Sequence, residues 1–109
     1  MLDRYPEVAD LDPDEGEALT VELLVTDDVL VKAFALGPGA RIEPHEHADA
    51  TNVFHVLQGA VTVVRDDEEE RVSAPAVVPN ERGATHGARN EGDEPTVLTA
   101  SLCPLPGGD

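Results

Sequence analysis

Short runs of alternating apolar and polar residues follow one another along most of the chain. Val, Leu, Ile and Ala recur at every second position, which is the pattern of a strand with one buried face. No run keeps a helical period over about ten residues or more, and clusters of Gly and Pro separate the runs. The pattern predicts an all-β sandwich, jelly roll or small barrel, with strands at residues 18–26, 29–36, 40–47, 52–58, 60–65, 71–78, 84–90 and 96–102.

Three segments interrupt this alternation or lie outside it. Residues 1–17 lack periodicity, carry two prolines and form an N-terminal acidic arm. This arm either lies across the domain or reaches a partner subunit, or it is a solvated tail. The acidic residues 66–70 predict a solvated hairpin tip, and residues 79–83 predict a loop. The barrel is expected over residues 18–103, with a C-terminal tail at 104–109.

The length and composition bound the kind of protein. A chain of 109 residues is long enough for one domain with a single core. No apolar run approaches the roughly 18 residues of a membrane helix, and no signal-peptide core is present. A location in the cytoplasm is therefore expected. The single cysteine, Cys103, excludes an intramolecular disulfide and a multi-cysteine metal site.

The net charge of the chain bears on its partners and on its dependence on salt. The chain carries 23 Asp and Glu against 7 Lys and Arg, for a net charge of −16, and its only lysine is Lys32. Such a surface repels nucleic acids and anionic membranes, because phosphate contacts need Lys and Arg. The combination of high acidity and scarce lysine is similar to that of proteins from salt-accumulating halophiles. It predicts a strong dependence on salt, which screens the self-repulsion of the surface.

Histidines supply the candidate chemistry. His45 and His47 are two residues apart in a predicted strand, so both rings leave the same face. His86 follows 39 residues after His47, in a stretch punctuated by Pro and Gly. Neutral imidazole is a preferred ligand of zinc, copper, iron and nickel. The three rings are therefore candidate ligands of one metal ion, provided that the fold brings them together.

The residues around the histidine pair resemble the first motif of the cupin superfamily. In that motif a glycine, a His-x-His pair, a glutamate and a closing glycine follow one another at set spacings. Gly39, His45, His47 and Gly59 match, and Asn52 stands at the glutamate position.

Residues 73–90 resemble the second cupin motif. Pro79, Gly83, His86 and Asn90 match it. Ser73 replaces its first glycine, and two extra residues lie between Pro79 and Gly83. Together the two motifs extend the resemblance over about residues 20–102.

The resemblance implies a double-stranded β-helix, a jelly-roll barrel that binds one divalent transition metal (Fe, Mn, Ni, Cu or Zn). The implied ligands are His45, His47 and His86, with Asn52 as a further candidate. An amide at position 52 is a weaker ligand than a carboxylate, leaves the site more positive by one charge and removes one possible general base. Three alternatives stay open: a metal-dependent dioxygenase or isomerase/lyase acting on a small metabolite, a non-catalytic binder of a metal or small molecule, and a degenerate metal-free pocket. No catalytic residue and no organic cofactor are assigned.

Other side chains near the motifs have two interpretations each. Glu43 shares the parity of His45 and His47 and is either a replacement carboxylate ligand or a charge at the strand edge. Phe54 and Val56 share the parity of Asn52 and are expected to line the pocket, which Gln58 could also reach. Solvated positions are favoured over ligand roles for Glu46 and Asp49, an outward position for His55, and a buried structural role for Cys103. Arg41, Arg82 and Arg89 either bind an anionic substrate or pair with surface acids.

The outward positions of the central strand bear on assembly. Val53, His55 and Leu57 alternate with the pocket-facing residues and would leave apolar surface on a monomer. Small cupins resemble one another in pairing through the outer face of one sheet. A homodimer is therefore expected.

Overall fold

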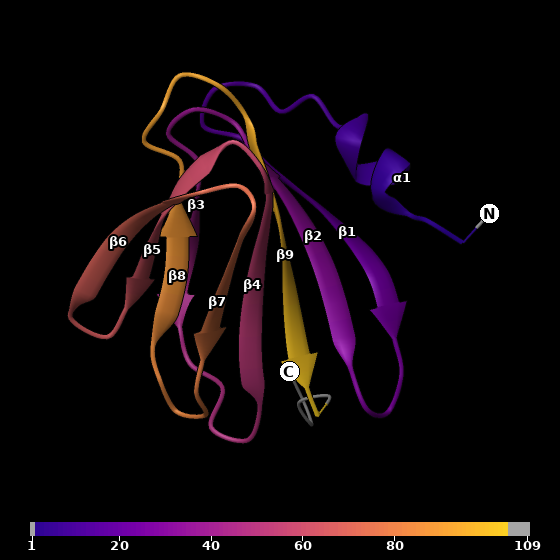
Figure 1. The fold of residues 1–109 in the computed structure, drawn as a ribbon, viewed down its shortest axis with the longest axis vertical. Coiled ribbons are helices and arrows are strands. Elements are labelled where there is room, and N and C mark those ends of the chain that lie inside the picture. The colour runs from indigo at the N-terminus through magenta and orange to yellow at the C-terminus, as the bar shows by residue number, and fades with distance from the viewer. Residues whose placement is uncertain (1, 105–109) are drawn as a thin grey trace.

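Two antiparallel sheets face each other in the computed structural model, which describes residues 2–104. Within those residues nine strands follow one short helix, which confirms the all-β prediction (Figure 1). The elements are α1 (Tyr5–Ala9), β1 (Ala18–Val25), β2 (Leu30–Leu36), β3 (Arg41–His45), β4 (Thr51–Gln58), β5 (Ala60–Arg65), β6 (Glu68–Ser73), β7 (Ala76–Asn80), β8 (His86–Arg89) and β9 (Thr96–Cys103). No helix in this part of the chain is long and apolar enough to cross a membrane.

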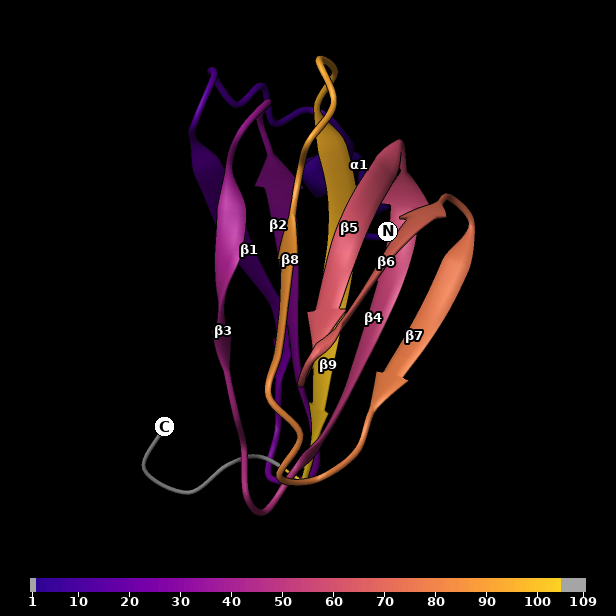
Figure 2. The same ribbon diagram turned by 90° about the vertical axis from the view of Figure 1, so that its left-hand side faces the viewer.

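The strand order places the two sequence motifs in opposite sheets. The larger sheet has the order β1-β2-β9-β4-β7 and the smaller one β3-β8-β5-β6. Figure 2 looks onto the smaller sheet, with the larger one behind it. The histidines of β3 and β8 therefore belong to the smaller sheet, and Asn52 on β4 faces them from the larger one.

The core lies between the sheets and comes from alternate residues of each strand. On β4, Phe54 and Val56 are 1% exposed, and on the neighbouring β9 Leu98 is fully buried. Small and branched residues fill the rest of this cluster, which includes Leu36, Ala40, Val61, Val63, Ala88 and Ala100. The period-two alternation of the sequence is thus the alternation between this core and the outer faces.

Part of the N-terminal arm packs on the domain through α1. Helix α1 packs on the outer face of the larger sheet, where Val8 is fully buried against Ala33, Ala35 and Val97. The hydroxyl of Tyr5 donates a hydrogen bond to the Gln58 side chain at 3.1 Å. A helix of five residues is too short to show a period in the sequence, which is why it was not predicted.

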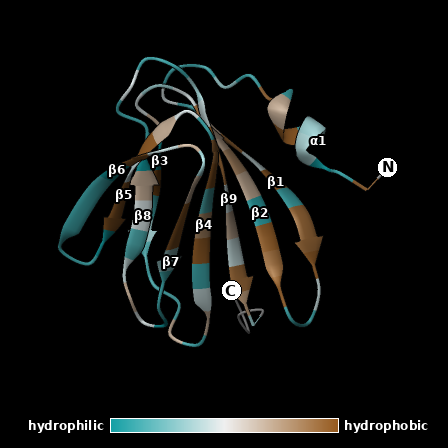
Figure 3. Cartoon of the chain, in the orientation of Figure 1, coloured by the Kyte–Doolittle hydropathy of each residue, from teal (hydrophilic) through white to brown (hydrophobic). Residues whose placement is uncertain are grey.

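The region from 66 to 83 differs most from the prediction. The acidic tip is only a turn at Asp66 and Asp67, and the glutamates after it form β6 along the edge of the smaller sheet, the hydrophilic strand in Figure 3. The single strand expected at 71–78 is two strands, β6 and β7, which pair in different sheets. The loop expected from residue 79 begins later, because Pro79 and Asn80 belong to β7. Proline fits there because β7 is an edge strand.

Candidate metal centre

Three histidines meet at the edge of the space between the sheets, where His86 is buried, His47 half-buried and His45 exposed. His45, His47 and His86 each offer a ring nitrogen, and these atoms lie within 4.8 Å of one another. The ring centroids of His45 are 4.9 Å from His47 and 4.6 Å from His86, and those of His47 and His86 are 5.6 Å apart. The structure therefore brings together all three histidines that the sequence selected.

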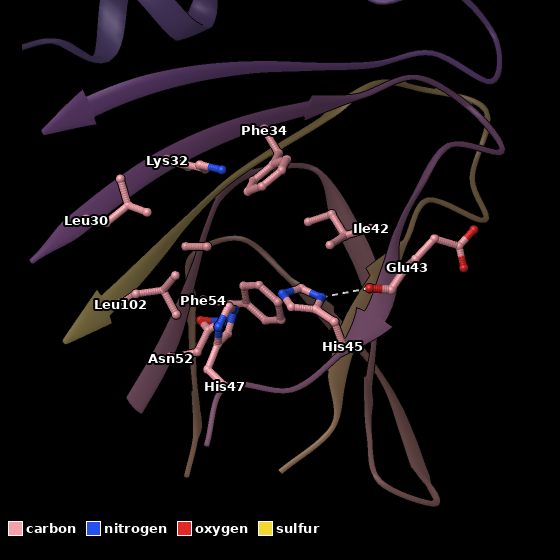
Figure 4. Close-up of a pocket in the computed structure, with 11 residues that line it drawn as sticks. Leu30, Lys32, Phe34, Ile42, Glu43, His45, His47, Asn52, Phe54 and Leu102 are labelled. Carbon is pink, nitrogen blue, oxygen red and sulfur yellow. Dashed lines mark hydrogen bonds between the residues drawn. The ribbon is translucent and has the colours of Figure 1, made fainter. Parts of the chain in front are cut away.

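A bulge in β3 aims His45 inward and turns Glu43 away. Ile42 pairs with Ala88, but His45 pairs with His86, so β3 has one more residue than β8 between these pairs. The extra residue breaks the regular alternation that would have placed Glu43 and His45 on one face. The Glu43 carboxylate instead pairs with Arg41 at 2.7 Å and points away from the histidines (Figure 4).

Close contact between β3 and β8 depends on Gly87, next to the third histidine. A side chain at this position would place its Cβ 2.7 Å from the carbonyl oxygen of Ile42 and 3.0 Å from Pro44. Neither contact is possible for a larger residue unless the backbone moves. Gly87 therefore lets the bulged strand approach β8 and sets the rings of His45 and His86 side by side.

Two loops hold the other histidines in place. The Gly83 amide donates to the carbonyl of His47 at 3.0 Å, which ties the His47 segment to the turn before β8. On the other side of that turn, Asp66 and Thr85 exchange two hydrogen bonds, at 2.8 and 3.1 Å.

Asn90, the last residue of the second motif, has a structural role: its buried amide donates to the carbonyls of Leu36 and Glu94.

The hydrogen bonds of the rings leave nitrogens directed at the shared space. The Nδ1 of His45 donates to the Glu43 carbonyl at 2.8 Å, and that of His86 donates to the Ala84 carbonyl at 3.1 Å. With Nδ1 protonated, the lone pair of Nε2 is available as a ligand. The Nε2 of His86 is buried and has no hydrogen-bond partner within residues 2–104. Burial, together with repulsion from His45 and His47, lowers the pKa of His86 against the opposing effect of its hydrogen bond to Ala84, and so favours the neutral form of the ring that a metal needs.

Two buried amides lie next to each other on β4 and β7 of the larger sheet. Asn52 is 2% exposed, and its Oδ1 has no hydrogen-bond partner in the described part of the chain. Asn80 pairs directly with Asn52 across β4 and β7, is fully buried and leaves both polar side-chain atoms without a partner there. Unsatisfied buried polar atoms are costly and rare. The orphaned Nε2 of His86 and Oδ1 of Asn52 therefore fit a site built to receive a cation.

His45 and His47 line a cavity of about 520 Å³, a size typical of small-molecule sites. Its wall is mostly apolar, as Figure 4 shows, and includes His45, His47, Asn52, Leu30, Lys32, Phe34, Ile42, Glu43, Phe54, Ala100 and Leu102. Phe54 lines the cavity as expected, and its ring also meets His86 edge-on at 5.7 Å. Val56 lies two residues deeper on β4 and packs in the core instead.

The remaining candidates lie away from the cavity. His55 is half-buried on the outer face of β4, opposite Val77 and Thr99. Gln58 is turned to the outer face by a bulge between Val56 and Gln58, so it cannot join the pocket. Cys103 is exposed at the end of β9, so the expectation of a buried residue was wrong. Exposure also holds for Glu46, Asp49 and Arg82.

Two arginines that were candidates for an anionic substrate pair with surface acids. Arg41 pairs with Glu43, and Arg89 pairs with Glu69 and Glu91. The pKa of Arg89 is raised by its hydrogen bonds to these two carboxylates. Lys32 lines the cavity, although it lies in neither of the two sequence motifs. The sequence did indicate that Lys32 shares a face with Phe34, because the two are two residues apart in the strand predicted at 29–36.

Comparisons with known proteins agree with this architecture. The cupin domain family matches residues 33–102, and no curated protein matches the chain. Among solved structures, the protein TT1209 from Thermus thermophilus is 25% identical, with a TM-score of 0.84 over 94% of this chain and 96% of that one. An uncharacterised protein with a double-stranded β-helix domain from Klebsiella pneumoniae is 24% identical, with a TM-score of 0.80 over 89% and 85%. A predicted oxalate decarboxylase from Thermotoga maritima is 21% identical, with a TM-score of 0.77 over 83% of each chain. With the family match over most of its length and two facing sheets that form a double-stranded β-helix, the chain belongs to the cupin domain family.

Proposed function

We propose that this cupin binds one divalent transition metal through His45, His47 and His86 and acts on a small metabolite in the adjoining cavity. The observation that carries the proposal is the meeting of three ring nitrogens within 4.8 Å at the wall of a largely apolar cavity. Asn52 lines the same cavity, and its buried Oδ1 would be a fourth, weaker donor. Fe, Mn, Ni, Cu and Zn all suit such a set of ligands.

The chain's own residues would orient the metal and the substrate. The carbonyls of Glu43 and Ala84 fix the rings of His45 and His86 through their Nδ1 hydrogens. Phe34, Phe54 and Ile42 would present an apolar wall to the body of the substrate. A bound transition metal would supply Lewis acidity toward substrate oxygens, or redox chemistry.

The proton chemistry of the cavity favours a dioxygenase over an isomerase or lyase. An isomerase or lyase needs a general base near the reacting carbon. Within residues 2–104, the only carboxylate among the cavity-lining residues is that of Glu43, and it points away and pairs with Arg41. Asn52 stands where a carboxylate would serve. Oxidation of a metabolite by dioxygen makes a smaller demand on a protein base, so it is the reaction class we infer.

Metal analysis of matched variants tests the metal site. We expect the protein, purified at high salt, to bind about one equivalent of a divalent metal, and His86→Ala to abolish binding because one of three strong donors is lost. His55→Ala is the control, since His55 lies on the outer face. Less than about 0.1 equivalent of any metal, with no uptake on titration, would contradict the proposal. Equal binding by the His86 and His55 variants would show that the ligand set is wrong.

Oxygen consumption separates the enzyme from a binder. The metal-loaded protein is offered small catechols, thiols and diketones, each with and without a carboxyl group, and oxygen uptake is recorded with the His86→Ala variant as the blank. Uptake that depends on His86 supports a dioxygenase. Saturable binding of one of these compounds without turnover supports the alternative, a non-catalytic small-molecule or metal-binding cupin.

We also infer a setting and an assembly for the domain. The net charge of −16 and the scarcity of lysine suit a salt-rich cytoplasm such as that of a halophile. Raising the salt from about 0.1 to about 2 M should raise the urea midpoint of unfolding, because screening weakens self-repulsion. The outer face at Val53, His55 and Leu57, where Leu57 and the neighbouring Val77 are exposed, suits a homodimer. A stability that falls with added salt would argue against the halophilic setting.

A further inference from the structure

Lys32 is an unusual residue for the place it occupies. It projects from β2 into the cavity, between Leu30 and Phe34 on the same face of the strand. Across the sheet its partner is Ala100, whose small side chain leaves room beside it. Lysine is seldom buried without a partner. An apolar side chain would fit this wall better, so the cation needs an explanation.

The protein offers many acids, but within residues 2–104 none of them pairs with Lys32. The chain has 23 Asp and Glu and only this one lysine. Arg4, Arg41 and Arg89 each pair with a carboxylate, whereas no ion pair or hydrogen bond joins the Lys32 ammonium to another group within residues 2–104. Glu22 stands directly opposite on β1, but it is exposed and makes no ion pair with Lys32. A half-buried cation among apolar side chains is therefore left available to a ligand.

The position of Lys32 in the cavity suggests what that ligand is. In Figure 4 the lysine lies on one side, on β2, and His45 and His47 lie on the other, with Phe34, Phe54 and Leu102 around the space between. A molecule that fills the cavity thus meets a cation at one end, an apolar wall in the middle and imidazole donors at the other end. The volume of about 520 Å³ suits a small organic molecule.

We propose that Lys32 binds a carboxylate of the ligand, whose apolar body fills the cavity and whose far end reaches the three histidines. The proposal deepens the proposed function and rests on it only for the far end. The ammonium donates charge-assisted hydrogen bonds to the carboxylate oxygens, which are strong where water is scarce. The substrate class is therefore a small monocarboxylic acid with an apolar body, and neither a neutral compound nor a polymer.

The test uses metal-free protein, so that it does not depend on the histidines. With one lysine in the chain, isotope labelling of lysine gives a single ammonium signal in NMR spectra. Phenylacetate is titrated at fixed salt concentration against its neutral counterpart, phenylacetamide. We expect saturable shifts of the Lys32 signal with phenylacetate, and binding at least about tenfold weaker for the amide. An unmoved signal up to about 50 mM phenylacetate, or equal binding of acid and amide, would overturn the proposal.

Variants matched in charge complete the test. Lys32→Met keeps the length of the side chain and should lose at least about tenfold in phenylacetate affinity, while Lys32→Arg should keep most of it. Arg82→Met removes the same charge from an exposed loop and should leave affinity unchanged. If Lys32 were structural, Lys32→Met would lower the urea midpoint. We expect the midpoint to hold or rise, because methionine suits the wall between Leu30 and Phe34.

The outcomes separate the two proposals. Failure at Lys32 with metal binding intact removes the carboxylate class and leaves the metal site standing. Carboxylate binding at Lys32 in a protein that takes up no metal leaves the subsite standing and removes the metal-dependent reaction.

Discussion

The two faces of the larger sheet come from the same strands, but they leave different groups unsatisfied. The inner face holds polar groups without partners in the described chain, among them the Oδ1 of Asn52 and the ammonium of Lys32. The outer face is covered by α1 over β2 and β9, while further along it Leu57 and Val77 are 42% and 63% exposed. Unsatisfied polar groups inside are typical of a binding site. Exposed apolar residues outside are typical of a docking surface. Unsatisfied polar groups thus distinguish the inner face as a candidate ligand site, and exposed apolar residues distinguish the outer face as a candidate protein-binding surface.

The largest expected effect comes from truncating one leucine on each face and comparing the losses in the free energy of unfolding. Leu98→Ala, on the inner face, should cost about 2–5 kcal/mol in the free energy of unfolding, because it leaves a cavity in the core. Leu57→Ala, at an exposed position, should cost less than about 0.5 kcal/mol. Urea unfolding at fixed high salt measures both. Because Leu98 does not line the ligand cavity, a folded Leu98→Ala protein should still bind metal.

Equal losses of stability in the two leucine variants would contradict the difference in burial between the two faces. A loss at Leu57 that grows with protein concentration would instead sharpen it, because it would show that the exposed position is covered in an oligomer.

The next effect concerns the part of the outer face that α1 covers. Val8 is fully buried against Ala33, Ala35 and Val97. Val8→Ala should lower the free energy of unfolding by about 2 kcal/mol, because most of a buried valine side chain is lost. Val25→Ala is the matched control at an exposed position on β1 and should change it by less than about 0.5 kcal/mol. A Val8 variant as stable as the control would mean that the arm contributes nothing to the fold in solution.

The sequence predicted the inner face better than any other part. Period-two alternation selected Phe54 and Val56 as inward residues and His55 as outward, and β4 keeps that parity up to Val56. The two motifs also identified the three histidines, because the spacing of residues within each motif assigns His45 and His47 to one strand and His86 to another. These features are local patterns, so they can be read without knowing how strands pair.

Features that depend on pairing between distant strands could not be predicted. The bulge that turns Glu43 away arises where β3 meets β8, and Gly87 permits it. Asn80 looked like a loop residue because Pro79 precedes it, yet pairing with β4 buries it opposite Asn52. Lys32 lay in a predicted strand, but its importance follows from the cavity that distant strands form around it.

The third test places a glutamate on each face in turn, at position 52 or position 53, and compares the metal affinity of the two variants. Asn52→Glu should tighten metal binding by about tenfold, or about 1.4 kcal/mol, because a carboxylate is a stronger ligand than an amide oxygen. Val53→Glu puts the same charge on the outer face and should leave metal affinity unchanged. Calorimetric titration of the metal-free proteins measures the difference. Weaker binding by Asn52→Glu would mean that the amide has another function, for instance toward Asn80 or the substrate.

The smallest expected effect on stability tests the bare part of the outer face. Val77 on the edge strand β7 is 63% exposed and lies beside His55 of β4. If this surface pairs two copies of the chain, Val77→Asp buries a charge in the interface and should convert the protein from a dimer to a species of 11.5 kDa. Its effect on the unfolding of that monomer should stay below about 0.5 kcal/mol, because the residue is exposed there. Sedimentation at high salt gives the mass, and Glu22→Gln, which alters charge on the distant strand β1, is the control. A monomer before any substitution would show that the exposed valines and leucines are tolerated singly, and the comparison would then hold for the inner face alone.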